Sequence, residues 1–423
     1  MITLLYDSIF IIFAIIYLPI FLVKRKFHQG FRQRLGFLPV YNPKQAPIWV
    51  HMVSVGEAIM MRPFVAQLRK DYPDRPLVLS TVTVTGNKIA KHMAKDGDLV
   101  CYLPLDISFI VRRFLRKINP ALIILAETEL WPNLITAAEC KKIPVVIVNG
   151  RISDGSFGGY RMVRFLLKPL LSKVNLFCMQ TDLDKERLEI LGVMPKKTKV
   201  TKSMKFDATL PQIDTAHIKS LKDKLHILDS EKIFIAASTH QGEEEIILAV
   251  YKELLAEFSD LRLVIVPRHP ERAPEVSNLI TKLGFSVVRI SQLNPLTRQP
   301  ANPPTVFILD TVGELINYYA IADIVFMGGS FVRSGGHNIL EPALLKKPIV
   351  FGPHMFNFRS ISDMFLKKEA AILLHNEQEL KEKLRNLLSD KAFADRMGAI
   401  AYKIIEDNRG ATKLTLIYLK EVF

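Results

Sequence analysis

The chain is 423 residues long, and 49% of its residues are hydrophobic and 23% are charged. This length exceeds one ordinary domain and predicts two or three, while the composition excludes a disordered chain. Lysine and arginine number 57 against 42 aspartate and glutamate, and the net charge of +15 favours anionic partners: nucleic acid, anionic lipid or phosphorylated substrates. The 3 cysteines show no CxxC spacing, which argues against a disulfide framework or a structural zinc site.

The first 23 residues are predicted to be a membrane anchor. Residues 2–23 are mostly apolar, and the stretch is long enough for one span of about 20 residues. Three basic residues follow at 24–26 and favour a cytoplasmic location for the rest of the chain. No basic region precedes the apolar run and no small-residue cleavage site follows it, which argues against a signal peptide. Asp7 and Pro19 leave open a second interpretation, an interfacial helix that lies in the membrane surface.

Short apolar strands alternate with helical segments along the rest of the chain. The first set of expected strands comprises residues 48–50, 77–81, 100–103, 122–125, 145–148 and 176–179. After a polar, lysine-rich interval at 195–232, the second set comprises residues 233–237, 261–266, 285–289, 306–309, 324–327 and 349–351. Such alternation indicates parallel sheets built from βαβ units. We therefore expect an α/β protein with two Rossmann-like domains, residues 24–210 and 211–423, that face each other across a cleft.

Two expected strands of the first domain end in acidic loops. Glu57 follows the strand at 48–50, on the loop or first turn of a helix, and Glu127 follows the strand at 122–125. Ligands of open α/β sheets bind at the carboxyl ends of strands, so two carboxylates there indicate acid–base chemistry. The alternative for Glu57 is a helix-terminal acid that stabilises the helix dipole and needs no substrate.

A glycine-rich segment directly follows the expected strand at 324–327. Its four glycines let the backbone approach a ligand closely, and a helix expected to start near Asn338 points free N–H groups at the same space. Asn338 and Glu341 are three residues apart, so a capping box without a ligand is the alternative. The capping box leaves the glycines and His337 unexplained, and we therefore favour phosphate and ribose binding.

Other expected strand ends of the second domain also carry polar residues. They are the segments at 238–240, 267–272 and 313–314. Arg268 suits a phosphate because a guanidinium binds two oxygens at once, although an ion pair with Glu271 is the simpler alternative. Topology brings these loops and the glycine-rich segment to one crevice, which predicts a nucleotide site.

These motifs resemble those of the 3-deoxy-D-manno-octulosonic acid (Kdo) transferases of lipopolysaccharide synthesis. The similar segments are the apolar start with its basic flank and residues 54–57, 127–133, 205–207, 238–240, 268–272, 335–338 with Glu341, and 352–357. The sequences Glu-Thr-Glu-Leu-Trp-Pro-Asn at 127–133 and Gly-Gly-His-Asn at 335–338 are specific to that pattern. One departure is Lys202, where the family usually has glycine.

The resemblance implies a GT-B fold and an inverting transfer of Kdo from CMP-Kdo to a phosphorylated lipid A precursor, lipid IVA, without a metal or other cofactor. It implies that Glu57 is the general base and that Glu127 and Lys205 stabilise the transition state. The residues implied to hold CMP are Pro267, Arg268, Val312, Gly313, Glu314, Asn338, Ile339, Leu340 and Glu341. Its location would be the cytoplasmic side of the inner membrane, and an anionic donor, acceptor and membrane lipid would account for the positive charge.

Two alternatives remain. One is a GT-B enzyme with another donor, such as a UDP-sugar transferase or a non-hydrolysing epimerase, which would share the glycine loops. The other is a basic membrane tether that binds anionic lipid or nucleic acid without catalysis. Carboxylates at 57, 127 and 129 would repel phosphates, so we expect no nucleic-acid partner.

Overall fold

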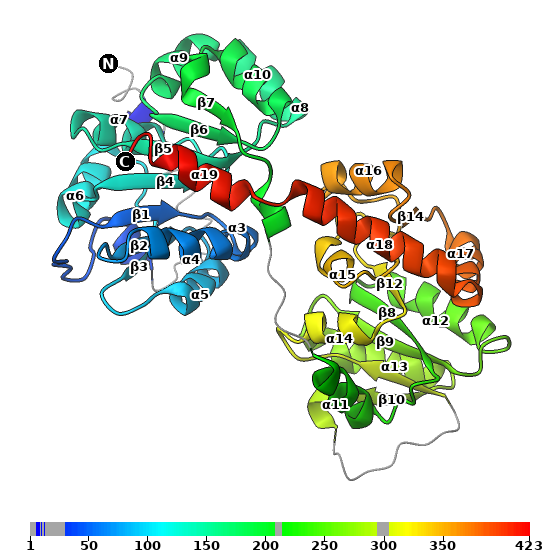
Figure 1. Ribbon diagram of the computed structural model, residues 1–423. Helices are drawn as coiled ribbons and strands as arrows, with labels where there is room; N and C mark the ends of the chain where they lie inside the picture. The colour runs from blue at the N-terminus through cyan, green and yellow to red at the C-terminus, as the bar shows by residue number, and fades with distance from the viewer. Residues whose placement is uncertain (1–5, 9, 11, 13–29, 208–213, 294–303) are drawn as a thin grey trace. The chain divides into compact units, whose positions relative to one another are not determined.

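The computed structural model describes residues 6–8, 10, 12, 30–207, 214–293 and 304–423, which belong to two compact units (Figure 1). Unit 1 comprises Met1–Thr209 and Asn408–Phe423, and unit 2 comprises Leu210–Asp407. The expected anchor at 1–23 falls almost entirely outside the described residues. In the described part of the chain, no helix is long and apolar enough to cross a membrane.

Unit 1 contains a parallel sheet of seven strands in the order β3-β2-β1-β4-β5-β6-β7. The strands are β1 (Ile48–His51), β2 (Leu77–Thr81), β3 (Leu99–Tyr102), β4 (Leu122–Ala126), β5 (Val145–Gly150), β6 (Leu176–Met179) and β7 (Thr198–Val200). Every residue of β1, β2, β4, β5 and β6 is buried, because helices cover both faces of the sheet. This double burial is why the strands form continuous apolar runs instead of alternating patterns.

Two helical layers cover the two faces of this sheet (Figure 1). The helices of one layer are α3 (Val55–Met60), α4 (Arg62–Asp71), α5 (Val84–Met93) and α19 (Ala411–Leu419). Those of the other layer include α6 (Ser108–Ile118), α7 (Pro132–Cys140), α9 (Arg164–Leu171) and α10 (Asp182–Leu191). The remaining helices of the unit are α2 (Phe31–Arg34), α8 (Asp154–Met162) and the 3₁₀ turns η1 (Pro195–Lys197) and η2 (Met204–Asp207).

The last helix of the chain packs on unit 1, whereas the sequence places residues 408–423 in the second domain. Asp207 determines this position, since its carboxylate accepts the backbone N–H groups of Gly410 at 2.7 Å and Thr412 at 2.5 Å. These are unpaired donors at the start of α19, and a carboxylate stabilises that end of a helix. Leu416 and Leu419 then lie in the core on the side of α3 and α4.

Unit 2 repeats the arrangement with a second parallel sheet, in the order β10-β11-β9-β8-β12-β13-β14. Its strands are β8 (Lys232–Thr239), β9 (Leu261–Pro267), β10 (Ser286–Arg289), β11 (Thr305–Ile308), β12 (Ile324–Met327), β13 (Ile349–Phe351) and β14 (Ile372–Leu373). Its helices are α11 (Thr215–Leu225), α12 (Glu243–Leu254), α13 (Ala273–Lys282), α14 (Leu315–Ile321), α15 (Leu340–Leu344), α16 (Arg359–Lys367), α17 (Glu377–Ser389) and α18 (Lys391–Asn408), with 3₁₀ turns η3 (Pro270–Arg272) and η4 (Ile290–Gln292). Helices α12, α13, α17 and α18 share one core with the sheet.

The expected strands all form, and three local features differ from the expectation. The short strands β7 and β14 add one edge to each sheet, and neither has an apolar run long enough to identify it. The helix expected after Glu57 is two helices, because Pro63 lies in the first turn of α4 and cannot continue the hydrogen bonds of α3. The helix expected near Asn338 begins at Leu340 and has only five residues.

A buried carboxylate joins the ends of β8 and β12 in unit 2. Glu243, in the first turn of α12, accepts backbone N–H groups from Gly329 at 2.7 Å and from Ser330 and Phe331 at 3.0 Å each. It also accepts the N–H of His240 at 2.9 Å. The glycine-rich segment after β12 therefore has a fixed backbone, and Gly328 allows it to approach β8 closely because a Cβ there would lie 2.5 Å from the Ser238 carbonyl oxygen.

Replacing Glu243 with glutamine is expected to destabilise unit 2 by about 3 kcal/mol or more, because a buried amide cannot accept four N–H groups as a carboxylate does. Urea unfolding measures the loss, and hydrogen exchange of residues 329–331 should become faster. Glu245→Gln is the matched control, since Glu245 accepts only one exposed N–H, from Gly242. Equal stability of the two variants would contradict this role of Glu243.

Candidate active site

The strand order reverses once in each sheet, and the candidate residues lie at those two places. In unit 1 the chain proceeds from β1 to β2 and β3 on one side, then continues from β4 on the other side of β1. In unit 2 the reversal lies between β8 and β12. Ligands of open α/β sheets bind at the carboxyl edge at such reversals. Glu57 follows β1 and Glu127 follows β4, while the glycine-rich segment follows β12.

Glu57 occupies the first turn of α3 and is half-buried. Its two carboxylate oxygens accept hydrogen bonds from the Val53 N–H at 2.8 Å and the Ser54 hydroxyl at 3.0 Å, and the Ser54 oxygen caps the helix. Burial raises the pKa of Glu57, and the charge of Glu127 raises it further, while these hydrogen bonds oppose the shift. Glu57 is therefore a fixed carboxylate with an enhanced affinity for protons. It can stabilise the start of α3 and also accept a proton from a substrate, so the two roles considered for it are compatible.

Three carboxylates gather at this edge of unit 1. Burial and the charges of Glu57 and Glu127 raise the pKa of Glu129 to about 7. Glu127 has a φ of 58°, a left-handed conformation that is costly for a residue with a side chain. Its N–H binds the Val148 carbonyl at 2.8 Å, so neighbouring β5 holds the strained turn in place. Strain and like-charge crowding together are typical of functional sites.

Lys205 lies in η2, which contacts α3, so the structure places this lysine near the helix that carries Glu57. The Met204 N–H binds the Asn149 side-chain oxygen at 2.9 Å, and Phe206 is buried, which anchors the turn on both sides of Lys205. Lys202 has a φ of 65°, in the left-handed region where glycine is preferred. This conformation explains why a glycine suits position 202, and it shows that a lysine there still adopts a left-handed turn.

Part of the segment at 127–133 has a structural role. The Asn133 side-chain nitrogen donates to the Asp7 carboxylate at 2.7 Å and to the Asp106 carbonyl at 2.6 Å. The Asp106 carboxylate accepts the N–H groups of Asn133 and Leu134 at the start of α7. Asp7 is a buried hydrogen-bond acceptor of unit 1, which accounts for an acidic residue inside the apolar N-terminal stretch.

Histidines surround the reversal point of unit 2. The rings of His240 and His337 stack with centroids 5.2 Å apart, and their Nε2 atoms are 2.9 Å apart. The His269 ring meets that of His240 edge-on at 6.1 Å. Burial lowers the pKa of His337 to about 4, and Arg268 and the other two histidines lower it further. An Nε2–Nε2 hydrogen bond requires one ring to donate, so one of the two histidines carries a proton on Nε2 and the other accepts with an unprotonated Nε2.

Arg268 is exposed next to this cluster and makes no ion pair among the described residues. The alternative pairing with Glu271 does not form; His269 lies near Glu271 instead, with Nδ1 and Oε1 3.6 Å apart. Arg272 is occupied by Glu244 at 2.8 Å and by Glu275 at 3.1 Å. Arg268 is thus the guanidinium of this loop that can receive an anion, and Pro267, the last residue of β9, fixes the loop's start.

The other implied nucleotide residues form two loops. Val312 and Gly313 are exposed after β11, and the Glu314 carboxylate accepts the Thr311 hydroxyl. At the second loop the Asn338 amide donates to Glu341 at 3.1 Å, while its oxygen accepts the Leu340 N–H at 3.1 Å. Ile339 and Leu340 are buried. In a capping box each of the two side chains would accept a backbone N–H from the other residue, and Asn338 and Glu341 do not make these bonds among the described residues. Burial raises the pKa of Glu341.

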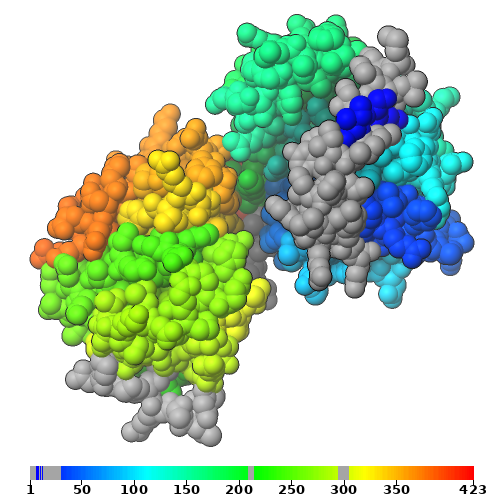
Figure 2. Space-filling model, turned by 180° about the vertical axis from the view of Figure 1, so that it is seen from behind, coloured from blue at the N-terminus to red at the C-terminus, as the bar shows by residue number. Residues whose placement is uncertain are grey.

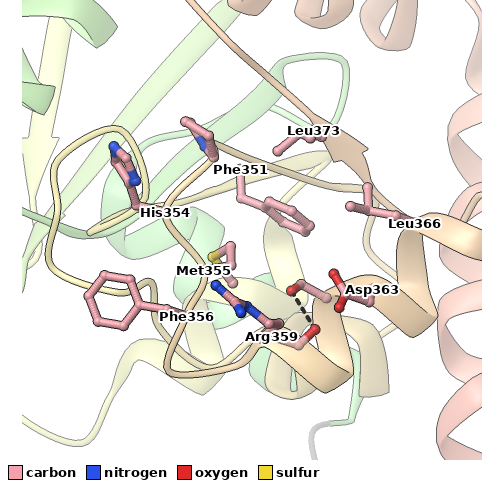
Figure 3. Close-up of a pocket in the computed structure, with 10 residues that line it drawn as sticks. Phe351, His354, Met355, Phe356, Arg359, Asp363, Leu366 and Leu373 are labelled. Atoms are coloured by element: carbon pink, nitrogen blue, oxygen red, sulfur yellow. Dashed lines mark hydrogen bonds between the residues drawn. The ribbon is translucent and has the colours of Figure 1, made fainter. Parts of the chain in front are cut away.

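A pocket of about 180 Å³ lies beside these loops, between the segment after β13 and helix α16 (Figure 3). Met355 and the exposed Phe356 line it together with Arg359 and Asp363 of α16. The segment also touches the glycine-rich loop, since a Cβ on Gly336 would lie 2.1 Å from the Met355 sulfur. In the described residues no group of histidine, cysteine, aspartate and glutamate has an arrangement suited to a metal ion.

Sequence reasoning missed two functional features. It assigned no catalytic role to Glu129, although the Glu-x-Glu spacing at 127–129 indicates a second acid on the same loop. It also missed Glu243, whose three glycine-loop partners are 86 to 88 residues away in the chain. The three consecutive glutamates at 243–245 were the available indication, because acids are common in the first turn of a helix.

Comparison with known proteins agrees with these observations. The family model of 3-deoxy-D-manno-octulosonic-acid transferase (kdotransferase) matches residues 29–208. The Haemophilus influenzae 3-deoxy-D-manno-octulosonic acid transferase is 37% identical over 93% of this chain and 92% of its own. The Chlamydophila psittaci enzyme of the same name is 30% identical over 90% of this chain and 88% of its own.

Among solved structures, UDP-GlcNAc 2-epimerase from Neisseria meningitidis, bound to UDP-GlcNAc, has a TM-score of 0.62 and 15% identity, and the match covers 89% of this chain and 100% of that one. This likeness shows the fold alone. Sequence identity over nearly the whole length determines the family: the chain belongs to the 3-deoxy-D-manno-octulosonic acid transferases.

Proposed function

We propose that this enzyme transfers Kdo from CMP-Kdo to a hydroxyl of a phosphorylated lipid A precursor, lipid IVA, in lipopolysaccharide synthesis, with inversion at the anomeric carbon. The observation that carries the proposal is the Glu57 carboxylate, which is fixed by two hydrogen bonds beside two further carboxylates at the strand reversal of unit 1. In a chain of this family, such a group suits the removal of a proton from the attacking hydroxyl.

In this mechanism the acceptor hydroxyl attacks the anomeric carbon of Kdo while Glu57 takes its proton and CMP leaves. A single displacement inverts the configuration and forms no covalent glycosyl-enzyme. Glu127 and Lys205 stabilise the transition state, and the raised pKa of Glu57 brings its basicity closer to neutral pH. The residues that hold CMP are those of the three loops at 267–268, 312–314 and 338–341.

Arg268 is the proposed partner of the CMP phosphate, and Glu341 that of the ribose hydroxyls. Arg268 is exposed and has no carboxylate partner among the described residues, while the adjacent histidine pair is polar and uncharged at neutral pH. Asn338 binds one oxygen of the Glu341 carboxylate, and no hydrogen bond to the other oxygen is formed by the residues that the structure describes. We further propose that residues 1–23 attach the enzyme to the inner membrane, with both units on the cytoplasmic side, on the basis of the apolar stretch and the bases after it.

The activity itself is tested with purified full-length chain, CMP-Kdo and a lipid A precursor, and mass spectrometry identifies the product. A mass increase by Kdo residues is expected. CMP should also raise the melting temperature more than UMP does. No transfer from CMP-Kdo, or equal stabilisation by UMP, would contradict the proposed donor and favour another GT-B activity.

Glu57→Gln is expected to lower turnover by about 10²–10⁴, the usual contribution of a general base. Melting temperature and CMP affinity should stay near those of the wild type, because glutamine still accepts the Val53 N–H. Asn376→Ala is the matched control: it removes the cap of α17 in unit 2, so it should cost about 1 kcal/mol of stability and leave turnover unchanged. A Glu57→Gln enzyme with more than about a tenth of wild-type turnover would overturn the assignment of the base.

Arg268→Ala should weaken CMP binding by about tenfold or more, since a charge-assisted hydrogen bond contributes about 1.5–3 kcal/mol. Isothermal calorimetry gives the affinity directly. Arg385→Ala serves as the control, because Arg385 is exposed on α17 and pairs only with Glu257 in the described structure. Unchanged CMP affinity in Arg268→Ala would remove Arg268 from the donor site.

The stability of unit 1 should depend on pH through Glu129, whose pKa is about 7 in the fold against an ordinary 4.5. Between these values the folded state binds more protons than the unfolded state, so stability falls as pH rises through this window. Glu129→Gln should therefore stabilise the protein more at pH 8 than at pH 5 in urea unfolding. Glu139→Gln, at an exposed site, should show no such difference. If Glu129→Gln changed the free energy of unfolding equally at pH 5 and pH 8, the raised pKa of Glu129 would be contradicted.

A further inference from the structure

A surface on α8 and α9 of unit 1 exposes apolar side chains that the proposed transfer does not use. Helix α8 ends at Met162 and α9 begins at Arg164, so the chain turns between them at Val163. The exposed fractions are 82% for Met162, 40% for Val163, 74% for Phe165 and 43% for Leu166. Apolar side chains this exposed on neighbouring positions mark an interaction site more often than isolated ones do. We call these residues, together with the nearby bases, the α8–α9 surface.

The bases of the α8–α9 surface are Arg161, Arg164 and Lys168, which are all exposed. None of them makes an ion pair within the described part of the chain. Residues 155–181 contain no aspartate or glutamate at all. The bases next to the exposed apolar side chains therefore have no acidic neighbour within this stretch of the chain, and their charge is available to a partner from outside.

The inner side of α9 is firmly packed, so the exposure does not come from a loose segment. Leu170 and Leu171 are buried in the core that α9 shares with α7 and α10, and Leu167 packs against it. Both views show α8 and α9 at the surface of their unit, in the green part of the chain (Figures 1 and 2). A fixed helix with one packed side and one apolar, basic side is the pattern of an interfacial helix.

Charge decides which partner fits this surface. A second copy of the chain in a symmetric dimer would bring the same bases together, and like charges would repel. An anionic bilayer instead offers acyl chains for the apolar groups and phosphates for the bases, and each base near such a surface contributes about 1 kcal/mol. Arginine is suited to the boundary between acyl chains and headgroups, because its apolar stem can lie along the acyl chains while its charged end binds the phosphates.

We propose that the α8–α9 surface lies on an anionic lipid bilayer, with its apolar side chains at the boundary between headgroups and acyl chains and its three bases against lipid phosphates. This contact is separate from residues 1–23 and independent of the assigned catalytic roles. It has a consequence that does rest on the proposed function. Helix α8 starts beside the loop of Glu127, because the Arg151 N–H binds the Thr128 hydroxyl at 2.8 Å. Docking would hold the carboxylate edge of unit 1 near a lipid acceptor.

The test uses the full chain with Cys140→Ser, which removes the exposed cysteine while Cys101 and Cys178 stay buried. Phe165→Cys is labelled with an environment-sensitive nitrobenzoxadiazole, and Leu228→Cys in unit 2, where the native side chain is 66% exposed, is the matched control. Both proteins are bound to vesicles of phosphatidylcholine with or without phosphatidylglycerol, at equal bound amounts. Lipids with brominated acyl chains then quench a label only when it enters the bilayer.

We expect the label at 165 to be quenched severalfold more than the label at 228, and only on vesicles with phosphatidylglycerol. Arg161→Gln, Arg164→Gln and Lys168→Gln together should weaken this docking by about a hundredfold, while the protein stays vesicle-bound. Equal quenching at the two positions, or equal quenching at 165 on neutral vesicles, would overturn the proposal. Shielding of the label at 165 before vesicles are added would also overturn it, since a protein would then cover the surface. Failure of Kdo transfer alone changes none of these readouts.

Discussion

A single reversal of strand order in each parallel sheet determines where this protein can bind and react. The loops before and after a reversal turn to opposite faces of the sheet, so the carboxyl edge is open there and nowhere else along the central strands. In unit 1 the reversal brings together the loops after β1 and β4, and in unit 2 those after β8 and β12. The carboxylates of unit 1, the glycine-rich segment and Arg268 lie on such a loop or on one beside it, whereas Lys205 follows β7 and residues 312–314 follow β11. The two helical layers on each sheet hold these edges in place.

The carboxylates at the two reversal points have different surroundings. In unit 2 the buried Glu243 accepts hydrogen bonds from four backbone N–H groups, and Arg268 and three histidines gather at the same edge of the sheet. This edge therefore favours an anion. In unit 1 the charge of Glu127 raises the pKa of Glu57, and the charges of Glu57 and Glu127 raise the pKa of Glu129, in each case in addition to burial. One fold thus provides an anion site at one reversal and a proton acceptor at the other.

The fold was largely predictable because buried parallel strands are continuous apolar runs, and twelve such runs became strands β1–β6 and β8–β13. The pairing of Glu57 with Glu127 was also predictable, since each follows a strand directly. The strands β7 and β14 were not, because two or three residues at a sheet edge need little hydrophobicity. The position of α19 depends on Asp207, more than 200 residues earlier, and no local pattern records such a contact. The same holds for Glu243 and the glycine-rich loop.

The family relationship and the site geometry support one division of labour, with the nucleotide on unit 2 and proton removal on unit 1. Hydrogen exchange of the full chain with and without saturating CMP tests this division most directly, because it reports each loop separately. Slower exchange is expected in residues 238–242, 267–272, 312–314 and 328–341, with no change in residues 52–57 and 127–133. If CMP slowed hydrogen exchange only in the loops of unit 1 and in none of unit 2, the assignment of the nucleotide to unit 2 would be contradicted.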